Sequence, residues 1–320
     1  MRKPVIAVAD SPFPSLDPVR AALAQLDPEP RLAACAAPED ILAVARDADA
    51  LIVCYAQLDG ALLRQLTRCK VIGRTGLGVD NIDLPAARER GITVTYVPDY
   101  CLHEVSDHAM ALLLALARKI AFANQTVQSG RWEMPAVVPI RRLHGQVLGL
   151  VGFGHIPRLV APKAQAFGLT VVAYDPYVAP DVLATAGVEG VSFDRLCGMS
   201  DLVSVHAPLL PATRGMLDAA AFARMKRGVL IVNTARGPLI DAAALVAALD
   251  AGQVGGAALD VLPVEPPGRD SPLLHRDNVI LTPHIGFYSV EALAELQTKA
   301  ATDVARVLRG EKPVYPIGMA

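Results

Sequence analysis

One glycine-containing turn constrains the fold of this chain more than any other segment. Residues 148–157 read Leu-Gly-Leu-Val-Gly-Phe-Gly-His-Ile-Pro, which predicts a buried strand, a sharp turn and the start of a helix. Gly152 permits the bend, and Gly154 lets backbone N–H groups approach a pyrophosphate, as in the phosphate-binding corner of dinucleotide folds. Pro157 replaces the third glycine expected of such a turn. Proline is tolerated there because a first-turn N–H has no intrahelical partner, although its bulk can move the helix outward.

The residues after the turn support the same fold. A helix is predicted over 159–167, and a second strand then ends in Tyr174-Asp175-Pro176. Asp175 follows Gly152 at about the 20-residue spacing of a ribose-binding acid. Its carboxylate would accept hydrogen bonds from the ribose hydroxyls and repel a 2′-phosphate, which favours NAD over NADP. The alternative is an ordinary glycine turn and a surface aspartate in another α/β protein.

Composition excludes several other classes of protein. The chain has 320 residues, enough for two domains, with a net charge of −2 and no basic block, so it offers no evident nucleic-acid or anionic-membrane surface. Its five cysteines are Cys35, Cys54, Cys69, Cys101 and Cys197. They form no C-x-x-C pair, which favours buried or idle thiols over disulfides or a metal site. The N-terminal apolar run stops at Asp10, too short for an export signal, so we expect a soluble cytoplasmic protein.

Short β-branched runs alternate with alanine-rich stretches, which predicts parallel βαβ units. The first series has predicted strands at 5–9, 50–54, 71–73 and 93–96. Its predicted helices are 17–26, 38–46, 58–67 and 83–91. A long helix over 103–119, apolar almost all round, is followed by a connection at 128–143 that holds the only tryptophan, Trp132. The second series has predicted strands at 147–151, 170–174, 202–205, 229–233, 256–259 and 279–281, and a last helix covers 289–308.

Long motifs then follow one another in a fixed order. They are Gly-Arg-Thr-Gly-Leu-Gly-Val-Asp-Asn-Ile-Asp at 73–83, Val-Asn-Thr-Ala-Arg-Gly at 232–237, Ala-Leu-Asp-Val at 258–261 and Asn-Val-Ile-Leu-Thr-Pro-His at 278–284. The chain resembles the D-isomer-specific 2-hydroxyacid dehydrogenases, the family that includes phosphoglycerate dehydrogenase. Residues 100–108 and 287–289 resemble the branch that contains C-terminal-binding-protein-like dehydrogenases.

Three residues carry the chemistry that this resemblance implies. His284 follows a predicted strand and is the candidate proton donor, since an imidazole titrates near working pH. Glu265 resembles the acidic partner that stabilises its imidazolium. Arg236 resembles the arginine that holds the substrate, and its planar fork suits a carboxylate. Each residue alone has a structural alternative: a packed or capping histidine, a solvated glutamate, an arginine clamp in a turn.

The remaining site residues are assigned by their place in the turn or by the resemblance. The predicted cofactor-binding residues are Gly152, Gly154, His155, Ile156, Tyr174, Asp175, Pro176, His206, Ala207, Pro208, Thr213, Thr234, Ala235, Asp260 and Gly286. The predicted substrate-binding residues are Tyr55, Gly76, Leu77, Gly78, Arg236 and Phe287. Asp260 resembles the residue that meets the nicotinamide carboxamide, and the alternative for Gly76 and Gly78 is an ordinary tight turn. The side chains of five histidines have no matching chemical role: His103, His108, His144, His155 and His275.

These observations together predict two doubly wound α/β domains. A Rossmann NAD-binding domain, 101–287, would be inserted into a flavodoxin-like substrate domain, 1–100 plus 288–320. The expected function is NAD-dependent D-2-hydroxyacid dehydrogenase. A keto acid with an uncharged side chain is expected in preference to phosphoglycerate, because the chain lacks the Arg-Ser that phosphoglycerate-type relatives often carry after the strand that here ends in Val53-Cys54-Tyr55. The alternatives are an NAD(H)-sensing corepressor-like module and an enzyme that oxidises formate or phosphite. We also expect a homodimer and no metal.

Overall fold

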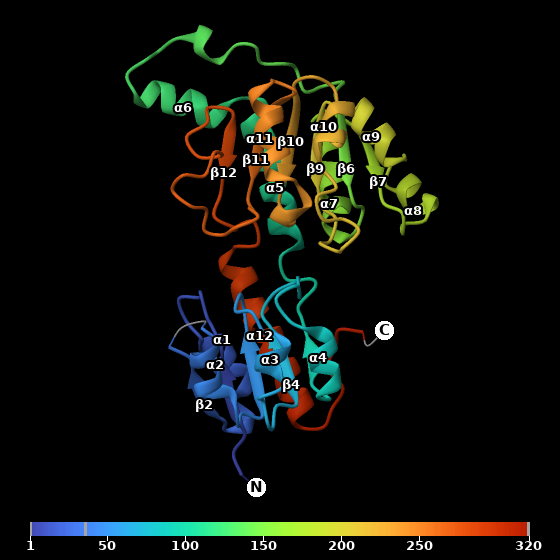
Figure 1. The fold of residues 1–320 in the computed structure, drawn as a ribbon. Helices are drawn as coiled ribbons and strands as arrows, with labels where there is room; N and C mark the ends of the chain where they lie inside the picture. The colour runs from blue at the N-terminus through green and yellow to red at the C-terminus, as the bar shows by residue number, and fades with distance from the viewer. Residues whose placement is uncertain (1, 35–36, 319–320) are drawn as a thin grey trace. The chain divides into compact units, whose positions relative to one another are not determined.

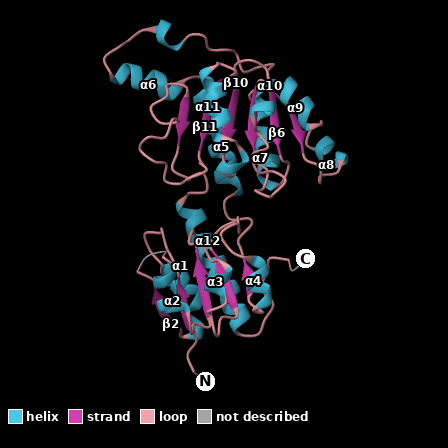
Figure 2. Cartoon of the chain, in the orientation of Figure 1, coloured by secondary structure: helices cyan, strands magenta, loops and turns pink. Residues whose placement is uncertain are grey.

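The computed structural model describes residues 2–34 and 37–318, so Cys35 lies outside the described residues. The chain forms two compact units, drawn in Figures 1 and 2. One comprises Met1–Cys101 and Ser289–Ala320, and the other comprises Leu102–Tyr288. Each boundary lies one residue after the one expected from the sequence.

The smaller unit contains a parallel sheet in the order β2-β1-β3-β4-β5, which is the flavodoxin-like order. Its strands are β1 (Val5–Val8), β2 (Glu29–Leu32), β3 (Ala50–Val53), β4 (Val71–Arg74) and β5 (Thr93–Thr95). Its helices are α1 (Asp17–Leu23), α2 (Pro38–Ala45), α3 (Gly60–Leu63), α4 (Leu84–Glu89) and α12 (Val290–Leu308). One apolar core lies under α2, α3 and α4, and a second lies under α1 and α12. Strands β1, β3 and β4 are buried on both faces, which explains their mainly apolar sequences.

Two predictions for this unit are corrected. Strand β2 was not predicted because its sequence, Glu-Pro-Arg-Leu, is polar; it pairs only with β1, at the sheet edge where proline and charge are tolerated. The helix predicted over 58–67 is only Gly60–Leu63. Leu58 instead donates its N–H to Asn81, and Thr67 donates its N–H to Arg46. Tertiary backbone pairing therefore removes both ends of the expected helix.

Helix α12 returns the end of the chain to the smaller unit (Figure 1). Ser289 caps the helix by accepting a hydrogen bond from the Ala292 N–H. Gly73 in β4 permits close packing of α12, because a Cβ there would lie 2.6 Å from a methyl carbon of Val304. The C-terminal helix is therefore part of the core of this unit.

The larger unit contains a seven-stranded parallel sheet in the order β12-β11-β10-β9-β6-β7-β8, the Rossmann order extended by one strand. Its strands are β6 (Val147–Val151), β7 (Thr170–Tyr174), β8 (Glu189–Gly190), β9 (Leu202–Val205), β10 (Val229–Asn233), β11 (Val254–Leu259) and β12 (Val279–Leu281). Its α-helices are α5 (Leu102–Ala117), α6 (Ile120–Gln128), α7 (His155–Ala166), α8 (Pro180–Thr185), α9 (Phe193–Met199), α10 (Ala219–Arg224) and α11 (Ala242–Asp250). The expected six strands become seven because β8, a two-residue edge strand, gives no apolar signal in the sequence.

Helix α5 is buried within the larger unit, where it packs on α7, β10 and β11. Its apolar residues share a core with α7, while α9, α10 and α11 cover the opposite face of the sheet. Helix α5 ends at Ala117. Lys119 has a left-handed backbone conformation, with φ of +52°, and is the N-cap of a second helix, α6. Helix α6 was not predicted. Both strand orders confirm the prediction of two doubly wound α/β sheets.

Candidate active site

The glycine turn lies where the strand order of the larger unit reverses, between β6 and β9. Ligands of doubly wound sheets bind outside the carboxyl ends of the strands at such a point. Gly152 has a φ of +95°, and a Cβ there would lie 2.9 Å from the backbone nitrogen of Ala207. Glycine is therefore required at 152 both for the turn and for the close approach of the segment that follows β9.

Gly154 serves a different purpose from Gly152. It is the N-cap of the twelve-residue helix α7 with φ of −74°, and a Cβ there would have no described atom within 4 Å. Open space therefore faces the first N–H groups of α7, which have no intrahelical partners and favour an anion. Pro157 is buried in the first turn of this helix, as the sequence predicts. These features fit the pyrophosphate of a dinucleotide.

Asp175 is fixed against the glycine turn by two hydrogen bonds. Its Oδ2 accepts the Phe153 N–H at 2.8 Å, and its Oδ1 accepts the Tyr177 N–H at 2.9 Å. Tyr174 is the last residue of β7, and Pro176 follows Asp175 in the next loop. A carboxylate oxygen can accept about two hydrogen bonds, so Asp175 retains capacity for ribose hydroxyls.

The segment after β9 is ordered by its own hydrogen bonds. The His206 N–H donates to the Val151 carbonyl at 2.8 Å, and His206 Nε2 lies 2.8 Å from Ser204 Oγ. Desolvation lowers the pKa of His206 to about 4, so this ring is neutral at physiological pH. Thr213 Oγ1 donates to the Pro208 carbonyl at 2.6 Å and closes the loop. His206 therefore has the properties of a positioning group and not of a proton donor.

The turn after β10 is held by a buried asparagine that the sequence analysis did not single out. Asn233 Oδ1 accepts the Ala235 N–H at 3.0 Å, and Asn233 Nδ2 donates to the Arg236 carbonyl at 2.9 Å. Arg236 Nη1 donates to the Ala235 carbonyl at 2.7 Å. Thr234 Oγ1 is buried without a hydrogen-bond partner among the described residues, so this turn has an unused polar atom beside the predicted cofactor residues.

The three predicted catalytic residues come together in the larger unit. His284 Nδ1 lies 2.7 Å from Glu265 Oε2, and Glu265 Oε1 accepts the Leu262 N–H at 2.8 Å. Burial alone would raise the pKa of Glu265, but the hydrogen bonds from His284 and Leu262 and the charges of His284 and Arg236 lower it overall. Glu265 is therefore a carboxylate at neutral pH and accepts a hydrogen bond from the His284 ring.

Gly237 explains how Arg236 and Glu265 come close. A Cβ at position 237 would lie 2.0 Å from the carbonyl carbon of Leu262. Only glycine lets the turn that carries Arg236 touch the backbone at 262–263, three residues before Glu265. The resemblance supplied the residues of this site, while the reason for their proximity is this backbone contact.

The backbone of His284 is in a conformation that is uncommon for a residue with a side chain. Its φ is +54°, a strained region in which histidine is one of the more tolerated residues. Asp260 holds the segment in place: its carbonyl accepts the His284 N–H at 2.9 Å, and its carboxylate accepts the N–H groups of Ile285 and Gly286 at 2.9 and 2.8 Å. The Phe287 ring lies edge-on to His284, with ring centroids 6.4 Å apart.

The other predicted substrate residues, Tyr55 and the loop 76–78, belong to the smaller unit. Tyr55 follows β3, next to the reversal of strand order between β1 and β3. The carboxylate of Asp10, which follows β1, accepts the N–H groups of Cys54, Tyr55 and Ala56 at 2.7, 2.6 and 3.1 Å. Asp10 is thus a positioning residue for the Tyr55 loop that sequence reasoning missed.

A buried arginine lies beside the Gly76 loop. Arg74 is 9% exposed, its Nη1 donates to the Thr75 carbonyl at 2.8 Å, and its Nε is buried without a partner among the residues the structure describes. A Cβ at Gly76 would overlap this guanidinium, so glycine makes room for it. Arg74 belongs to the motif at 73–83, but no local pattern indicated that its side chain would be buried.

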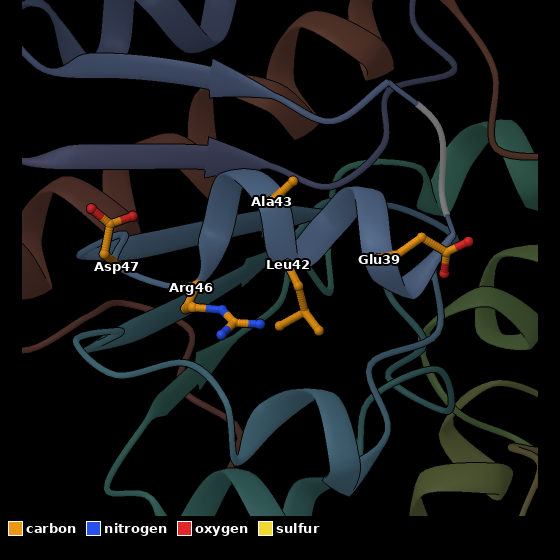
Figure 3. A pocket seen from close by; sticks show the side chains of 5 residues that line it. All are labelled: Glu39, Leu42, Ala43, Arg46 and Asp47. Carbon is orange, nitrogen blue, oxygen red and sulfur yellow. The ribbon is translucent and has the colours of Figure 1, made fainter.

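Other parts of the described chain carry no comparable chemistry. A hollow on the surface of α2, shown in Figure 3, contains none of the predicted site residues and is lined by Glu39, Leu42, Ala43, Arg46 and Asp47. Within residues 2–34 and 37–318, no three His, Cys, Asp or Glu side chains are grouped to hold a metal ion. The four cysteines in this range are buried and form no disulfide. None of the described helices is long and apolar enough to cross a membrane.

Comparisons with known proteins agree with this geometry. Residues 110–286 match the family described as D-isomer specific 2-hydroxyacid dehydrogenase, NAD binding domain. D-3-phosphoglycerate dehydrogenase of Mycobacterium leprae is 43% identical over 84% of this chain and 50% of its own length. The protein of the same name from Mycobacterium tuberculosis is 40% identical over 97% of this chain and 57% of its own length. The chain therefore spans about half the length of the curated relatives it matches.

Solved structures match over nearly their full length. The TT0316 protein from Thermus thermophilus is 33% identical, with a TM-score of 0.90 over 98% of this chain and 100% of that one. D-lactate dehydrogenase from Aquifex aeolicus, solved with NAD and lactic acid, is 28% identical, with a TM-score of 0.86 over 96% of each chain. Together with the match at 110–286, these similarities show that the chain belongs to the D-isomer specific 2-hydroxyacid dehydrogenase family, with an NAD-binding domain in the larger unit.

Proposed function

We propose that this chain is an NAD-dependent D-2-hydroxyacid dehydrogenase, which transfers hydride reversibly between NAD(H) and a small 2-keto or 2-hydroxy acid. The observation that carries the proposal is the 2.7 Å pair of His284 Nδ1 and Glu265 Oε2, with the charge of Arg236 acting on the same carboxylate. A proton donor, its acidic partner and a cation are the groups that reduction of a 2-keto acid needs from the protein.

His284 acts as general acid in reduction and as general base in oxidation. Because Nδ1 donates to Glu265, the opposite ring nitrogen, Nε2, is the one that carries the transferred proton. Bound NADH supplies the hydride, and NAD accepts it in the reverse direction. As the carbonyl oxygen gains charge, Nε2–H transfers its proton to it, leaving a hydroxyl on the product and a neutral imidazole. Glu265 stabilises the charged ring before this transfer.

The cofactor is assigned to the groups around the glycine turn. The N-terminus of α7 would bind the pyrophosphate in the open space before Gly154, and the Asp175 carboxylate would accept the ribose hydroxyls. The remaining lone pair of Asp260 Oδ2, which accepts the Gly286 N–H, would receive the nicotinamide carboxamide. These roles favour NAD because a 2′-phosphate would meet the charge of Asp175.

In the larger unit, Arg236 is assigned to the substrate carboxylate. In the smaller unit, the family resemblance assigns the backbone of Gly76, Leu77 and Gly78 to substrate binding. Nearby, Arg74 adds a buried cation beside Gly76. The chain lacks, however, the Arg-Ser that phosphoglycerate-type relatives often carry after the strand that here ends in Val53-Cys54-Tyr55. We therefore propose a keto acid with an uncharged side chain, although curated relatives are named D-3-phosphoglycerate dehydrogenases.

Replacement of His284 by alanine tests the proposed acid/base role. We expect kcat to fall about 10²–10⁴-fold, the usual contribution of a general acid, while NADH affinity changes little. His275→Ala is a matched control, because His275 is exposed and has a similar φ of +58°. Turnover by His284→Ala as fast as by the control would remove His284 from the mechanism.

A panel of 2-keto acids with NADH, followed by NADH absorbance, tests the substrate. It should include glyoxylate, pyruvate, oxaloacetate, hydroxypyruvate, bulkier acids and the 2-keto form of 3-phosphoglycerate. We expect a higher kcat/KM for an uncharged side chain than for the phosphorylated acid. The opposite order would refute the inference from the missing arginine. Tight NADH binding with no turnover of any acid would favour an NAD(H)-sensing module instead.

We also propose that the chain forms a homodimer through residues 120–134, which follow α5 and include α6. Helix α5 is already buried in its own unit, whereas the next residues expose large apolar side chains. Trp132 is 89% exposed and Met134 is 74% exposed. Apolar groups gathered in this way mark protein interfaces. Light scattering should give a dimer mass for the native chain and a monomer mass for Trp132→Glu; a native monomer would refute the proposal.

A further inference from the structure

His108 on α5 contacts the segment that carries His284. The sequence alone did not indicate this contact. Its Nε2 lies 3.1 Å from Thr282 Oγ1 and 3.4 Å from Asp260 Oδ1. The ring also packs on Gly286, where a Cβ would lie 3.2 Å from His108 Cδ2. One side chain of α5 therefore touches the residues at the ends of β11 and β12 and the glycine beyond His284.

The hydrogen bonds among His108, Thr282 and Asp260 show which group donates and which accepts. Thr282 Oγ1 donates its single proton to Asp260 Oδ1 at 2.6 Å. The same hydroxyl must then act as acceptor toward His108, whose Nε2 donates. Burial alone would raise the pKa of Asp260, but the bonds from His108, Thr282, Ile285 and Gly286 lower it overall, so the acceptor at the centre is a carboxylate.

Asp260 connects this cluster to the backbone around His284. Its carboxylate accepts the N–H groups of Ile285 and Gly286, and its carbonyl accepts the N–H of His284 itself. Because His284 has a φ of +54°, its conformation persists only if the surrounding contacts enforce it. His108 and Thr282 fix the carboxylate that makes two of these contacts.

We propose that His108 is a positioning residue for the reaction: its Nε2–H holds Thr282 and Asp260 so that the segment 284–286 presents His284 in its working orientation. The inference rests on the proposed function in one respect, that His284 is the proton donor. The hydrogen-bonded cluster itself is independent of that function and can be tested without cofactor or substrate.

Two substitutions separate the hydrogen bond from simple packing. His108→Phe keeps an aromatic ring against Gly286 and removes the donor, whereas His108→Gln gives up the ring but retains an N–H near the position of Nε2. His103→Gln is the matched control, since His103 is exposed on the same helix. If His108 only filled space, the phenylalanine variant would behave like the wild type and the glutamine variant would be impaired.

Amide hydrogen exchange on the cofactor-free protein is the primary measurement. We expect the Ile285 and Gly286 amides to exchange about fivefold to tenfold faster in His108→Phe, which corresponds to the loss of one hydrogen bond, and to recover at least partly in His108→Gln. Unchanged exchange in His108→Phe would overturn the proposal, whether or not the protein turns over any keto acid.

Kinetics supply the second measurement. In His108→Phe, kcat should fall about fivefold to tenfold with a smaller change in the KM of the keto acid. In His108→Gln, kcat should be close to that of the wild type. Combination with Thr282→Val should be clearly less than additive, since both changes act on one carboxylate. Additive losses, or a His108→Phe enzyme with wild-type kcat, would overturn the positioning role while leaving the acid/base role of His284 intact.

Discussion

Replacement of Glu265 by glutamine removes a negative charge while keeping the shape of the side chain. The amide oxygen of glutamine can still accept the hydrogen bond from His284 Nδ1, which is 2.7 Å long in the native pair. Neutral imidazole is therefore held as before, but the imidazolium loses its counter-ion. The change isolates the electrostatic contribution of Glu265 from its contribution to geometry.

The size of this contribution follows from the distance and the exposure. Unit charges about 4 Å apart interact by about 4 kcal/mol at an effective dielectric constant of about 20. The side chains of His284 and Glu265 are 28% and 37% exposed, so water screens the pair and the value must be reduced toward that of surface pairs. We therefore take about 1.4 kcal/mol for the electrostatic contribution of Glu265, which corresponds to one unit on the pH scale, or tenfold in rate.

The sign of the pH effect follows from the lowered pKa of Glu265. Its carboxylate is fully charged above its ordinary value of 4.5, and its support of the charged ring is lost only as the pH falls through the lower folded value. Between about pH 5 and 8, where histidine titrates, Glu265 therefore acts as a constant negative charge. Its loss should move the pH midpoint for keto-acid reduction toward acid.

The assay is the pH profile of kcat/KM for NADH-dependent reduction and for the reverse oxidation. We expect the reduction midpoint of Glu265→Gln to lie about one unit lower, with reduction about tenfold slower at pH values above both midpoints. Oxidation should begin at a correspondingly lower pH. Glu89→Gln, on the exposed end of α4, is the control. An unchanged midpoint would refute the electrostatic role of Glu265.

Two further changes test the cofactor site. Asp175→Ala should narrow the preference for NAD over NADP by about tenfold or more in the ratio of kcat/KM, since it removes the charge opposed to a 2′-phosphate; an unchanged ratio would reject the ribose assignment. Gly152→Ala should destabilise the chain by about 1–3 kcal/mol and abolish NADH binding, because its Cβ would lie 2.9 Å from the Ala207 backbone at a φ of +95°. Thermal unfolding and fluorescence titration measure both effects, and native-like values would contradict the packing argument.

Strands with apolar sequences were predictable from the sequence, and the two polar edge strands were not. The central strands of the larger unit are buried and appear as apolar runs, so β6, β7, β9 and β10 have the predicted ends. The half-buried edge strand β12 is also apolar and has the predicted ends. Strands β2 and β8 lie at sheet edges, where polar residues and proline are favoured. Helix α6 was missed because the left-handed residue before it is Lys119 and not a glycine, so the sequence shows no break between the two helices.

The candidate catalytic residues came from a resemblance, and the structure adds the contacts that hold them. His108 and Thr282 are 174 residues apart, and Asp10 is 44 residues from Cys54. No local pattern reports such pairings, because they depend on which strand ends become neighbours in the sheet. A lone aspartate or histidine in the sequence therefore gave no indication of these positioning roles.

The contact between Gly237 and the backbone at 262–263 also divides the connection between β11 and β12 into two parts, which differ in how well they tolerate inserted residues. Up to Glu265 the chain is fixed, because any added residue would shift the carboxylate away from His284. Residues 268–270 are exposed and belong to neither a helix nor a strand. Exposed polar segments of this kind accept added residues readily. A peptide tag or a fluorescent reporter could therefore be inserted at 268–270 without disturbing the Arg236–Glu265–His284 site.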